Sequence, residues 1–291
     1  MKTYLESFTL ASRSDEESFI LNFPYQLEMQ CYSHTNVYPF KIFPQKRFSS
    51  VEFAPITVFY GGNGSGKSTL LNIIAEKLAL QRAASFNDTP YFASYLDHCD
   101  FLLSQDLPEG SRMIASDDVF DLLLGRRSIN ENIDRKRNRL FREYEETREM
   151  EYRFDSFSDY ADLKRRNEAK RQTKSVYTAA RLPKELNGLS NGESAFSYFT
   201  NEIRENALYL LDEPENSLSP RLQRELADFL MDSARFYGCQ FVISTHSPFL
   251  LAMKGARIYD LDSVPVRERK WTELENVRAY YDFFKAHEGE F

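Results

Sequence analysis

The chain has 291 residues, of which 42% are hydrophobic, so it can bury a large core as one domain or two lobes, and wholesale disorder is excluded. Its net charge of −7 excludes a general attraction to nucleic acid or anionic lipid. No apolar run approaches the roughly 20 residues that span a bilayer, and Met1–Glu6 lacks the features of a signal peptide. The three cysteines, Cys31, Cys99 and Cys239, are far apart and odd in number. We therefore expect a cytoplasmic protein with reduced thiols and no membrane partner.

Residues 1–54 contain short aromatic and aliphatic runs separated by polar residues and proline. This pattern predicts strands at Tyr4–Leu10, Phe19–Phe23 and Phe40–Phe43, which would form an antiparallel layer beside the main sheet. Several aromatics of this region could stack on an adenine ring, although most aromatics in such strands belong to the core. The candidates are Tyr38, Phe40 and Phe43.

A glycine-rich stretch at residues 61–69 satisfies the pattern GxxxxGK[ST] of phosphate-binding loops. It follows an apolar run at 55–60, which predicts a buried strand, and precedes residues 70–78, whose apolar positions have helical spacing. The predicted nucleotide-binding residues are Gly61, Gly62, Asn63, Gly64, Ser65, Gly66, Lys67, Ser68 and Thr69.

Strand, glycine loop and helix form the context that phosphate binding requires. Glycine lets backbone N–H groups turn inward around phosphate oxygens, and the positive end of the following helix adds to the attraction. Lys67 would reach the β- and γ-phosphates, and the Ser68 hydroxyl would ligate Mg²⁺. The sequence therefore predicts a site for a nucleoside triphosphate with Mg²⁺.

Residues 126–181 differ in composition from the rest of the chain. They hold 16 Lys and Arg against 11 Asp and Glu, a net charge of +5, and there is no Gly or Pro between Arg126 and Leu182. Ile129, Ile133, Leu140 and Tyr144 have helical spacing, and residues 155–159 are a weak point, which predicts a hairpin of two amphipathic helices. A solvated arm of mixed charge is the simpler interpretation, and a basic surface for nucleic acid or a partner is the alternative.

From Leu189 onward, predicted helices and strands alternate, which favours a parallel α/β core. We expect helices from Ser190 to about Asn206, from Pro220 to Ser233 and around 273–287, and strands at 207–214, 240–248 and 257–261. The resulting fold class is α/β, with domain boundaries at 1–125, 126–188 and 189–291. The first and third of these segments form the core, and the second a helical lobe.

Two carboxylates end the predicted strand at 207–214. Because ligands of parallel sheets bind at the carboxyl ends of the strands, Asp212 and Glu213 would reach the nucleotide. Asp212 would hold Mg²⁺ through the water shell of the metal, and Glu213 would accept a proton from the attacking water. Asp97 and Asp100 flank His98-Cys99, a group that could suggest a metal site. Because there is no second ligand pair at zinc spacing, we expect a surface or helix-end cluster instead.

These motifs together resemble the ATP-binding-cassette (ABC) ATPases, which include transporter engines and the RecF- and SMC-type heads of DNA repair. Residues 61–68 match the Walker A motif, 208–213 the Walker B motif, 189–193 the signature motif and 244–248 the switch-histidine segment of that superfamily. Residues 215–220 resemble the loop after Walker B in the RecF/SMC-like branch. The motif order and spacing fit, and the resemblance extends from about Phe53 to Leu261.

The resemblance implies a head-to-tail homodimer in which two ATP-Mg are sandwiched between the P-loop of one copy and the signature of the other. Lys67, Glu213 and His246 would be catalytic, and His246 would contact the γ-phosphate and sense its loss. The signature residues that would bind the γ-phosphate in trans are Ser190, Asn191, Gly192 and Glu193.

The chain departs from the family pattern at two places. A glutamine that normally contacts Mg²⁺ and the attacking water has no clear equivalent; Ser116 or Asp117 could substitute as a metal-site residue, and Gln105 is the other candidate. The aspartate of transporters after Walker B is replaced by residues 216–219, which argues against a transporter engine.

The resemblance thus implies a soluble ATP-hydrolysing protein that acts on DNA or on a partner effector in DNA repair or anti-phage defence. One alternative is a nucleotide-gated scaffold that regulates a nuclease or toxin partner. Another is the energy subunit of an ABC transporter, which would need a membrane partner.

Overall fold

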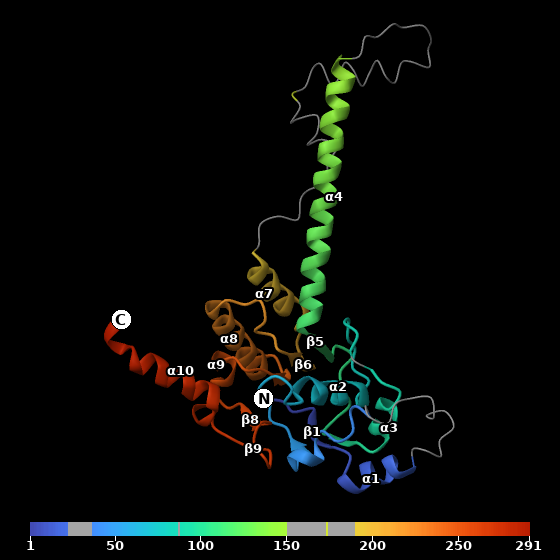
Figure 1. Ribbon diagram of the computed structural model, residues 1–291, viewed down its shortest axis with the longest axis vertical. Helices are drawn as coiled ribbons and strands as arrows, with labels where there is room; N and C mark the ends of the chain where they lie inside the picture. The colour runs from blue at the N-terminus through green and yellow to red at the C-terminus, as the bar shows by residue number, and fades with distance from the viewer. Residues whose placement is uncertain (23–36, 87, 150–172, 174–189) are drawn as a thin grey trace. The chain divides into compact units, whose positions relative to one another are not determined.

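The computed structural model describes residues 1–22, 37–86, 88–149, 173 and 190–291, with only the backbone for 125–134 and 147–148 (Figure 1). By its internal contacts the chain divides into two units. One comprises residues 1–119 and 190–291, and the other residues 120–189. The first unit holds every described residue of the motifs that the sequence analysis assigned to the nucleotide site.

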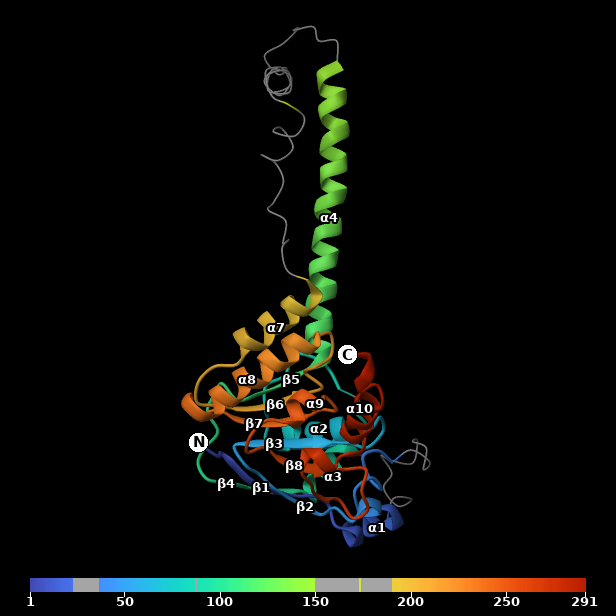
Figure 2. The same cartoon turned by 90° about the vertical axis from the view of Figure 1, so that its left-hand side faces the viewer.

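A six-stranded sheet forms the centre of the first unit, in the order β5-β6-β7-β3-β8-β9, and Figure 2 shows its strands from β5 to β8 side by side. The strands β5, β6, β7, β3 and β8 are parallel, and β9 is antiparallel to β8. The bounds are β3 Ile56–Tyr60, β5 Arg112–Ala115, β6 Leu208–Asp212, β7 Gln240–Ser244, β8 Arg257–Asp260 and β9 Arg267–Glu268. All five residues of β3 and all five of β7 are buried, as expected for parallel strands covered on both faces. This confirms the predicted mixed α/β fold.

A second, three-stranded antiparallel sheet has the order β2-β1-β4. Its strands are β1 Leu5–Thr9, β2 Ser50–Glu52 and β4 Asp100–Leu103. The predicted antiparallel layer is therefore present, and its first predicted strand corresponds to β1. The other two predicted strands are wrong.

Residues Phe19–Phe23 were expected to form a strand, but Phe19 lies in helix α1, Arg13–Asn22. A capping arrangement explains the start of this helix, because Ser12 Oγ accepts from Asp15 N at 3.2 Å and Asp15 Oδ2 accepts from Ser12 N at 3.2 Å. Residues 40–43 form turns, and the side chains of Phe40 and Phe43 are buried in the core. Neither can therefore stack on an adenine.

The helices predicted after the phosphate loop, from Ser190, from Pro220 and around 273–287 are present as α2, α7, α8 and α10, with ends that differ by a few residues, whereas α3 and α9 were not predicted. The bounds are α2 Lys67–Lys77, α3 Phe92–Asp97, α7 Asn191–Glu202, α8 Pro220–Phe236, α9 Pro248–Leu251 and α10 Glu275–Ala286. Single 3₁₀ turns occupy Pro44–Lys46, Trp271–Glu273 and Glu288–Glu290. Seven of the eleven residues of α2 are buried, since this helix packs against β6 and β7. Because α2 is packed in this way, it holds the end of the glycine-rich loop at residues 61–66 in place.

The charged segment begins with α4, Ser116–Glu149, whose first four residues belong to the first unit. Leu140 and Tyr144 of the predicted apolar face are buried. The predicted break at 155–159 and the second helix lie outside the described residues. None of the helices in the described ranges has both the length and the apolar character needed to cross a membrane.

Candidate functional site

The site residues gather where four neighbouring parallel strands end. The phosphate loop follows β3. Asp212 is the last residue of β6, and Glu213 follows it. His246 comes after β7, and Ser116 after β5. Strand register aligns these ends, since Asp212 lies opposite Ser244 of β7 on one side and opposite Ala115 of β5 on the other. This is the edge at which parallel sheets bind ligands.

The loop at 61–68 has the backbone that a phosphate cradle needs. Gly64 and Gly66 have φ angles of 79° and 94°, a region that side chains with a Cβ rarely adopt. At Gly61 a Cβ would lie 2.5 Å from Ser65 Oγ, so the loop folds back on itself there. A cavity of about 310 Å³ is lined by residues 63–69 and Glu213. The buried Ser65 Oγ has no hydrogen-bond partner among the described residues.

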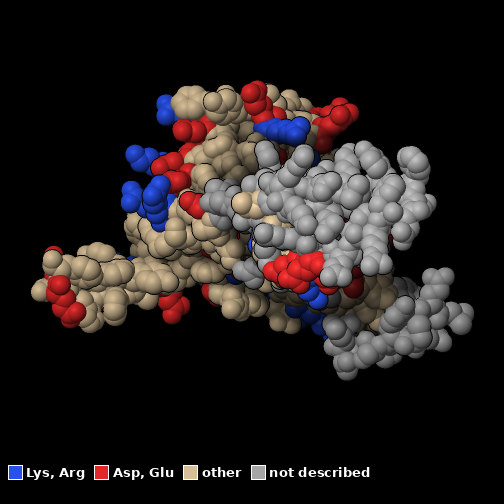
Figure 3. All heavy atoms as spheres, turned by 90° about the horizontal axis from the view of Figure 1, so that it is seen from above, with Lys and Arg blue, Asp and Glu red and all other residues tan. Residues whose placement is uncertain are grey.

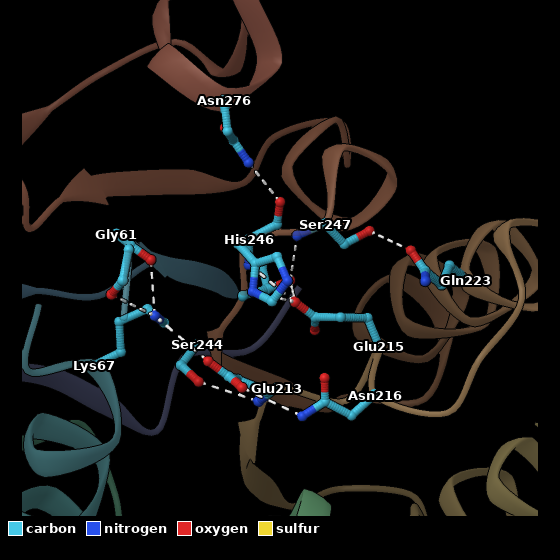
Figure 4. A network of polar contacts seen from close by, with 12 residues as sticks. Gly61, Lys67, Glu213, Glu215, Asn216, Gln223, Ser244, His246, Ser247 and Asn276 are labelled. Carbon is cyan, nitrogen blue, oxygen red and sulfur yellow. Dashed lines mark hydrogen bonds and ion pairs between the residues drawn. The ribbon is translucent and has the colours of Figure 1, made fainter. Parts of the chain in front are cut away.

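Lys67 lies in the base of this cavity and is almost fully buried. Its Nζ donates to the carbonyl oxygens of Gly61 and Gly62 at 2.7 and 3.1 Å and is 3.5 Å from Glu213 Oε1 (Figure 4). The ammonium group is therefore held by the loop and by the carboxylate predicted to act as base. A phosphate would offer it a stronger anionic partner in the same cavity.

Asp212 and Ser68 come together as the sequence predicts for a metal site. Ser68 Oγ donates to Asp212 Oδ1 at 3.1 Å, and Ser244 Oγ donates to the same oxygen. Burial raises the pKa of Asp212, so a cation beside its carboxylate would be favoured. Within the described ranges, no group of three or more His, Cys, Asp and Glu surrounds this point. One hydroxyl and one carboxylate fit Mg²⁺, which keeps waters and takes substrate phosphate oxygens as further ligands.

Glu213 is held by its backbone and by Asn216. It has a φ of 46°, its N–H donates to Ser244 O at 3.0 Å, and its Oε2 accepts from Asn216 Nδ2 at 3.3 Å. Asn216 stands in the segment that lacks the aspartate of transporters, so in this chain that segment orients the predicted base. The positive φ aims the Glu213 carboxylate at the cavity rather than along the strand.

His246 is half-exposed at the same edge, and its main chain is held from two sides. Its N–H donates to Glu215 Oε1 at 2.9 Å, and its carbonyl oxygen accepts from Asn276 Nδ2 at 2.7 Å (Figure 4). Asn276 also donates its own N–H to the Tyr60 hydroxyl at 3.2 Å. Tyr60 directly precedes Gly61, so Asn276 connects the switch histidine with the start of the phosphate loop.

The signature residues form a capped helix start. Ser190 Oγ accepts from Glu193 N at 3.2 Å, and Glu193 Oε2 accepts from Ser190 N at 2.7 Å, which is a reciprocal capping box. The N–H of Ser190 also lowers the pKa of Glu193. A Cβ on Gly192 would lie 3.1 Å from Ser217 O, so α7 approaches the loop after β6 closely. The lining of the phosphate-loop cavity contains residues 63–69 and Glu213 and none from this helix start.

The residues proposed to replace the glutamine have different positions. Ser116 and the exposed Asp117 follow β5 at the metal-site edge, whereas Gln105 follows β4 of the other sheet. The neighbouring Asp118 is buried and accepts from Ala84 N at 2.6 Å and Ala115 N at 2.8 Å, which fixes the chain as it leaves β5.

Among the aromatic candidates for adenine, the buried Phe43 ring lies beside Gly66 of the loop, and Tyr38 makes a hydrogen bond at the end of the loop. It is half-buried, and its hydroxyl donates to Thr69 Oγ1 at 3.1 Å.

Three further residues hold the site together although sequence reasoning did not select them. Glu215 and Asn276 hold His246, and Asp262 Oδ2 accepts from Gly62 N at 2.8 Å. The sequence did contain a signal for Glu215, because this acid comes two residues after Glu213, at the end of the strand that carries the two predicted site carboxylates. Asp262 and Asn276 had no such indication, since they lie about 200 residues from the loop in sequence.

Two of the cysteines are described. Cys99 and Cys239 are buried and free, and burial raises the pKa of Cys99 to about 12. Cys99 lies just after α3, beside His98 at the end of the helix, and no metal cluster forms there within the described residues. Cys31 falls outside these residues.

Residues 126–252 match the sequence profile of a family described as "AAA domain, putative AbiEii toxin, Type IV TA system". No curated protein matches the chain. The matched segment contains the signature, the Walker B motif and His246, and it begins after the phosphate loop.

Solved structures with a similar fold include SMC heads and an ABC cassette. The SMC head domain of Pyrococcus furiosus bound to the C-terminal domain of ScpA has 12% identity and a TM-score of 0.42, with 98% of this chain and 99% of that chain covered. The SMC head domain of Thermotoga maritima has 13% identity and a TM-score of 0.41, with 92% and 99% covered. The ATP-binding cassette MJ0796 bound to ADP and Pi has 16% identity and a TM-score of 0.35, with 76% and 88% covered.

Because these TM-scores are all below 0.5, the strand order, the phosphate loop and the family match carry the assignment. The P-loop follows β3, the Walker B carboxylates follow β6, and the switch histidine follows the strand between them. The chain has the fold of a P-loop protein, and its residues 126–252 match the AAA family described above.

Proposed function

We propose that the chain hydrolyses ATP to ADP and phosphate with Mg²⁺. The observation that supports this most directly is the convergence of Lys67, Glu213, Ser68 and Asp212 at one cavity. Glu213 would accept a proton from a water whose oxygen attacks the γ-phosphorus. The bond from the γ-phosphorus to the bridging oxygen breaks, and ADP leaves with that electron pair.

Each protein group would have a distinct task in this reaction. Lys67 binds the β- and γ-phosphates and neutralises charge as the bond breaks, and the loop N–H groups orient the phosphates. When bound through Ser68 and Asp212, Mg²⁺ supplies charge neutralisation at the phosphate oxygens. His246 would donate a hydrogen bond to the γ-phosphate. Tyr38, beside Thr69, is the proposed contact for the base.

We further propose that two copies close around two ATP molecules. Ser190, Asn191 and Glu193 are exposed, and their helix start is absent from the lining of the cavity at the phosphate loop of the same chain. A helix start with free donors attracts an anion, so the exposed signature is suited to a phosphate carried by another copy. Each site would then be complete only in the dimer.

The target of this ATPase is proposed to be DNA or a protein effector of a defence module. The family description, which names a toxin of a toxin–antitoxin system, favours an effector. In Figure 3, Lys and Arg are interspersed with Asp and Glu over the described part of the face drawn, which also favours a protein partner over a long stretch of DNA. Salt-sensitive binding of DNA to the ATP-bound protein would support DNA instead.

The decisive experiment uses Glu213→Gln, which keeps the size of the side chain and removes its basicity. The wild type should hydrolyse ATP, and the variant should bind ATP but turn over at least about 100-fold more slowly. Glu52→Gln on β2, 78% exposed in its side chain, is the matched control and should leave the rate unchanged. A Glu213→Gln variant as active as the wild type would refute the assignment of the base.

Size-exclusion chromatography of the same variant tests the dimer. With ATP and Mg²⁺ it should elute as a dimer, and a second substitution, Ser190→Arg, should return it to the monomer without loss of ATP binding. Monomers throughout, with ATP bound, would refute the proposed sandwich.

A further inference from the structure

The peptide unit between Gly61 and Gly62 is bound at both of its polar ends. Its carbonyl oxygen, Gly61 O, accepts from Lys67 Nζ at 2.7 Å (Figure 4). Its N–H, which belongs to Gly62, donates to Asp262 Oδ2 at 2.8 Å. A lysine of the phosphate loop and an aspartate 200 residues after Gly62 therefore hold one peptide unit between them.

This peptide unit has little preference of its own for one orientation. A peptide plane rotates through ψ of the residue before it and φ of the residue after it, and glycine restricts both angles least, because it has no Cβ. A Cβ on Gly62 would meet nothing nearer than Asp262 Oδ2 at 3.7 Å, so the loop itself does not crowd this residue. The orientation of the peptide unit therefore depends on the groups that bind it.

Asp262 can hold the peptide unit because the turn that carries it is itself fixed. It lies two residues after β8, which pairs with β3, and Leu261 N donates to Tyr60 O at 2.8 Å, directly before the phosphate loop. Leu261 O accepts from Lys46 Nζ at 2.6 Å, and Asp260 Oδ1 accepts from Asp262 N at 3.0 Å. The carboxylate is thus attached to the same part of the sheet as the loop that it contacts.

An acid at this position has an electrostatic disadvantage, because a carboxylate beside a phosphate loop repels phosphate. The side chain of Asp262 is exposed, so water and salt screen much of this repulsion. In return, a hydrogen bond from an N–H to an ionised acceptor is roughly twice as strong as one between neutral groups. The hydrogen bond to Gly62 N therefore gives a physical reason for an aspartate here.

We propose that Asp262 is a positioning residue, which keeps the Gly61 carbonyl oxygen turned towards Lys67 and so holds the ammonium group ready for phosphate. This inference rests on the proposed function, in which Lys67 binds the β- and γ-phosphates. Lysine has three donors, so Nζ can keep Gly61 O as a partner while another donor turns to phosphate. A lysine that is already in place loses less freedom when the nucleotide binds. Asp262 acts through the peptide unit and not on the phosphate itself.

Two substitutions separate the hydrogen bond of Asp262 from its charge. Asp262→Asn and Asp262→Ala both remove the negative charge, but the amide oxygen of asparagine can still accept from Gly62 N, whereas alanine has no acceptor. Binding of ATP with Mg²⁺ is measured in the Glu213→Gln background, in which the proposed base is removed. Asp262→Ala should bind ATP about fivefold more weakly than Asp262→Asn, the effect expected for one net hydrogen bond. Equal affinities of these two variants would overturn the inference.

Asp232→Ala is the matched control for the loss of an exposed aspartate. Asp232 lies near the end of α8, which leads from the nucleotide edge back to the start of β7. This variant should bind ATP as the parent protein does. Thermal melts without nucleotide should give the same stability for Asp262→Ala and Asp262→Asn, so that a general loosening of the fold does not explain the difference in affinity.

A second measurement needs no nucleotide. Selective ¹⁵N labelling gives backbone amide NMR signals from the 11 glycines, and Gly62→Ala identifies the signal of Gly62. Asp262→Ala and Lys67→Ala should both shift this signal, because one removes the acceptor of the N–H and the other the donor to the carbonyl oxygen of the same peptide unit. Asp232→Ala should leave it in place.

A Gly62 signal that does not respond to Lys67→Ala would overturn the inference whatever the affinities are. A parent protein that binds no ATP would refute the proposed function instead. In that case a Gly62 signal that responds to both substitutions would still show that Asp262 and Lys67 hold the same peptide unit.

Discussion

Glu16 of α1 is predicted to make the protein less stable as the pH rises. Its side chain is 3% exposed, Oε2 accepts from Lys41 N at 2.7 Å, and Oε1 has no partner among the described residues. Burial raises the pKa of Glu16 from 4.5 to about 7, against the opposing effect of the Lys41 N–H and charge. The folded state therefore prefers the protonated acid. Its contribution to stability is complete below about pH 4.5 and is lost as the pH rises through about 7.

The size of this effect follows from the shift in pKa. A pKa raised from 4.5 to about 7 amounts to about 3 kcal/mol of free energy. A glutamine can still accept from Lys41 N and carries no charge at any pH. Glu16→Gln should therefore raise the free energy of unfolding at pH 8 by up to about 3 kcal/mol and change it little at pH 4.5.

Urea unfolding at several pH values tests this, with the fluorescence of the single tryptophan, Trp271, as the probe. Glu17→Gln is the matched control, because the Glu17 side chain is on the same helix but 59% exposed. The difference in the free energy of unfolding between Glu16→Gln and the wild type should grow from pH 4.5 to pH 8. The corresponding difference for Glu17→Gln should stay constant. The reasoning would be refuted if the stabilities of Glu16→Gln and the wild type changed equally with pH, or if the variant were the less stable protein at pH 8. Either result would show that the charged form of Glu16 is not destabilising in the folded protein.

Other substitutions test separate parts of the structure. Gly238→Ala should lower the free energy of unfolding by about 1–3 kcal/mol, because its φ is 67° and a Cβ would lie 2.6 Å from Asn206 Oδ1; Gly255→Ala, with a φ of 80° but no atom within 4 Å, should have a smaller effect in the same thermal melts. Ser190→Ala removes one half of the capping box and should cost about 1 kcal/mol in urea titrations, and a neutral result would contradict the cap. In a Cys31→Ser variant, a thiol reagent should label Cys99 and Cys239 only after denaturation, since both are buried with raised pKa values, and rapid native labelling would contradict this.

The nucleotide edge could be predicted because its residues directly follow strongly apolar strands. β3, β6 and β7 are continuous buried runs, so their ends were visible in the sequence, and parallel pairing brings such ends together. Ser68 and Asp212 are 144 residues apart, and Ser68 Oγ lies 3.1 Å from Asp212 Oδ1. The motif order predicted that they meet, and the metal that they would share stays a prediction.

The N-terminal region was predicted less well because its aromatics are buried without forming strands. Phe19 stacks on Phe40 with ring centroids 4.5 Å apart, although the first lies in a helix and the second in a turn. Apolar runs of this length do not distinguish a strand from a buried helix, and the Ser12–Asp15 capping pair was the better indication. β2, β4 and β5 were missed since they have only three or four residues and depend on their neighbours for pairing.

Two contacts would keep Glu213 aimed at the cavity when a nucleotide binds. Lys67 Nζ donates to the carbonyl oxygens of Gly61 and Gly62 and lies 3.5 Å from Glu213 Oε1, so the ammonium group faces the loop and the proposed base together. A γ-phosphate is a stronger partner for Lys67 than the loop carbonyl oxygens, and its binding would draw the ammonium group away from Glu213. Asn216 Nδ2 donates to the other oxygen of Glu213 at 3.3 Å and does not depend on Lys67, so the carboxylate would keep its orientation.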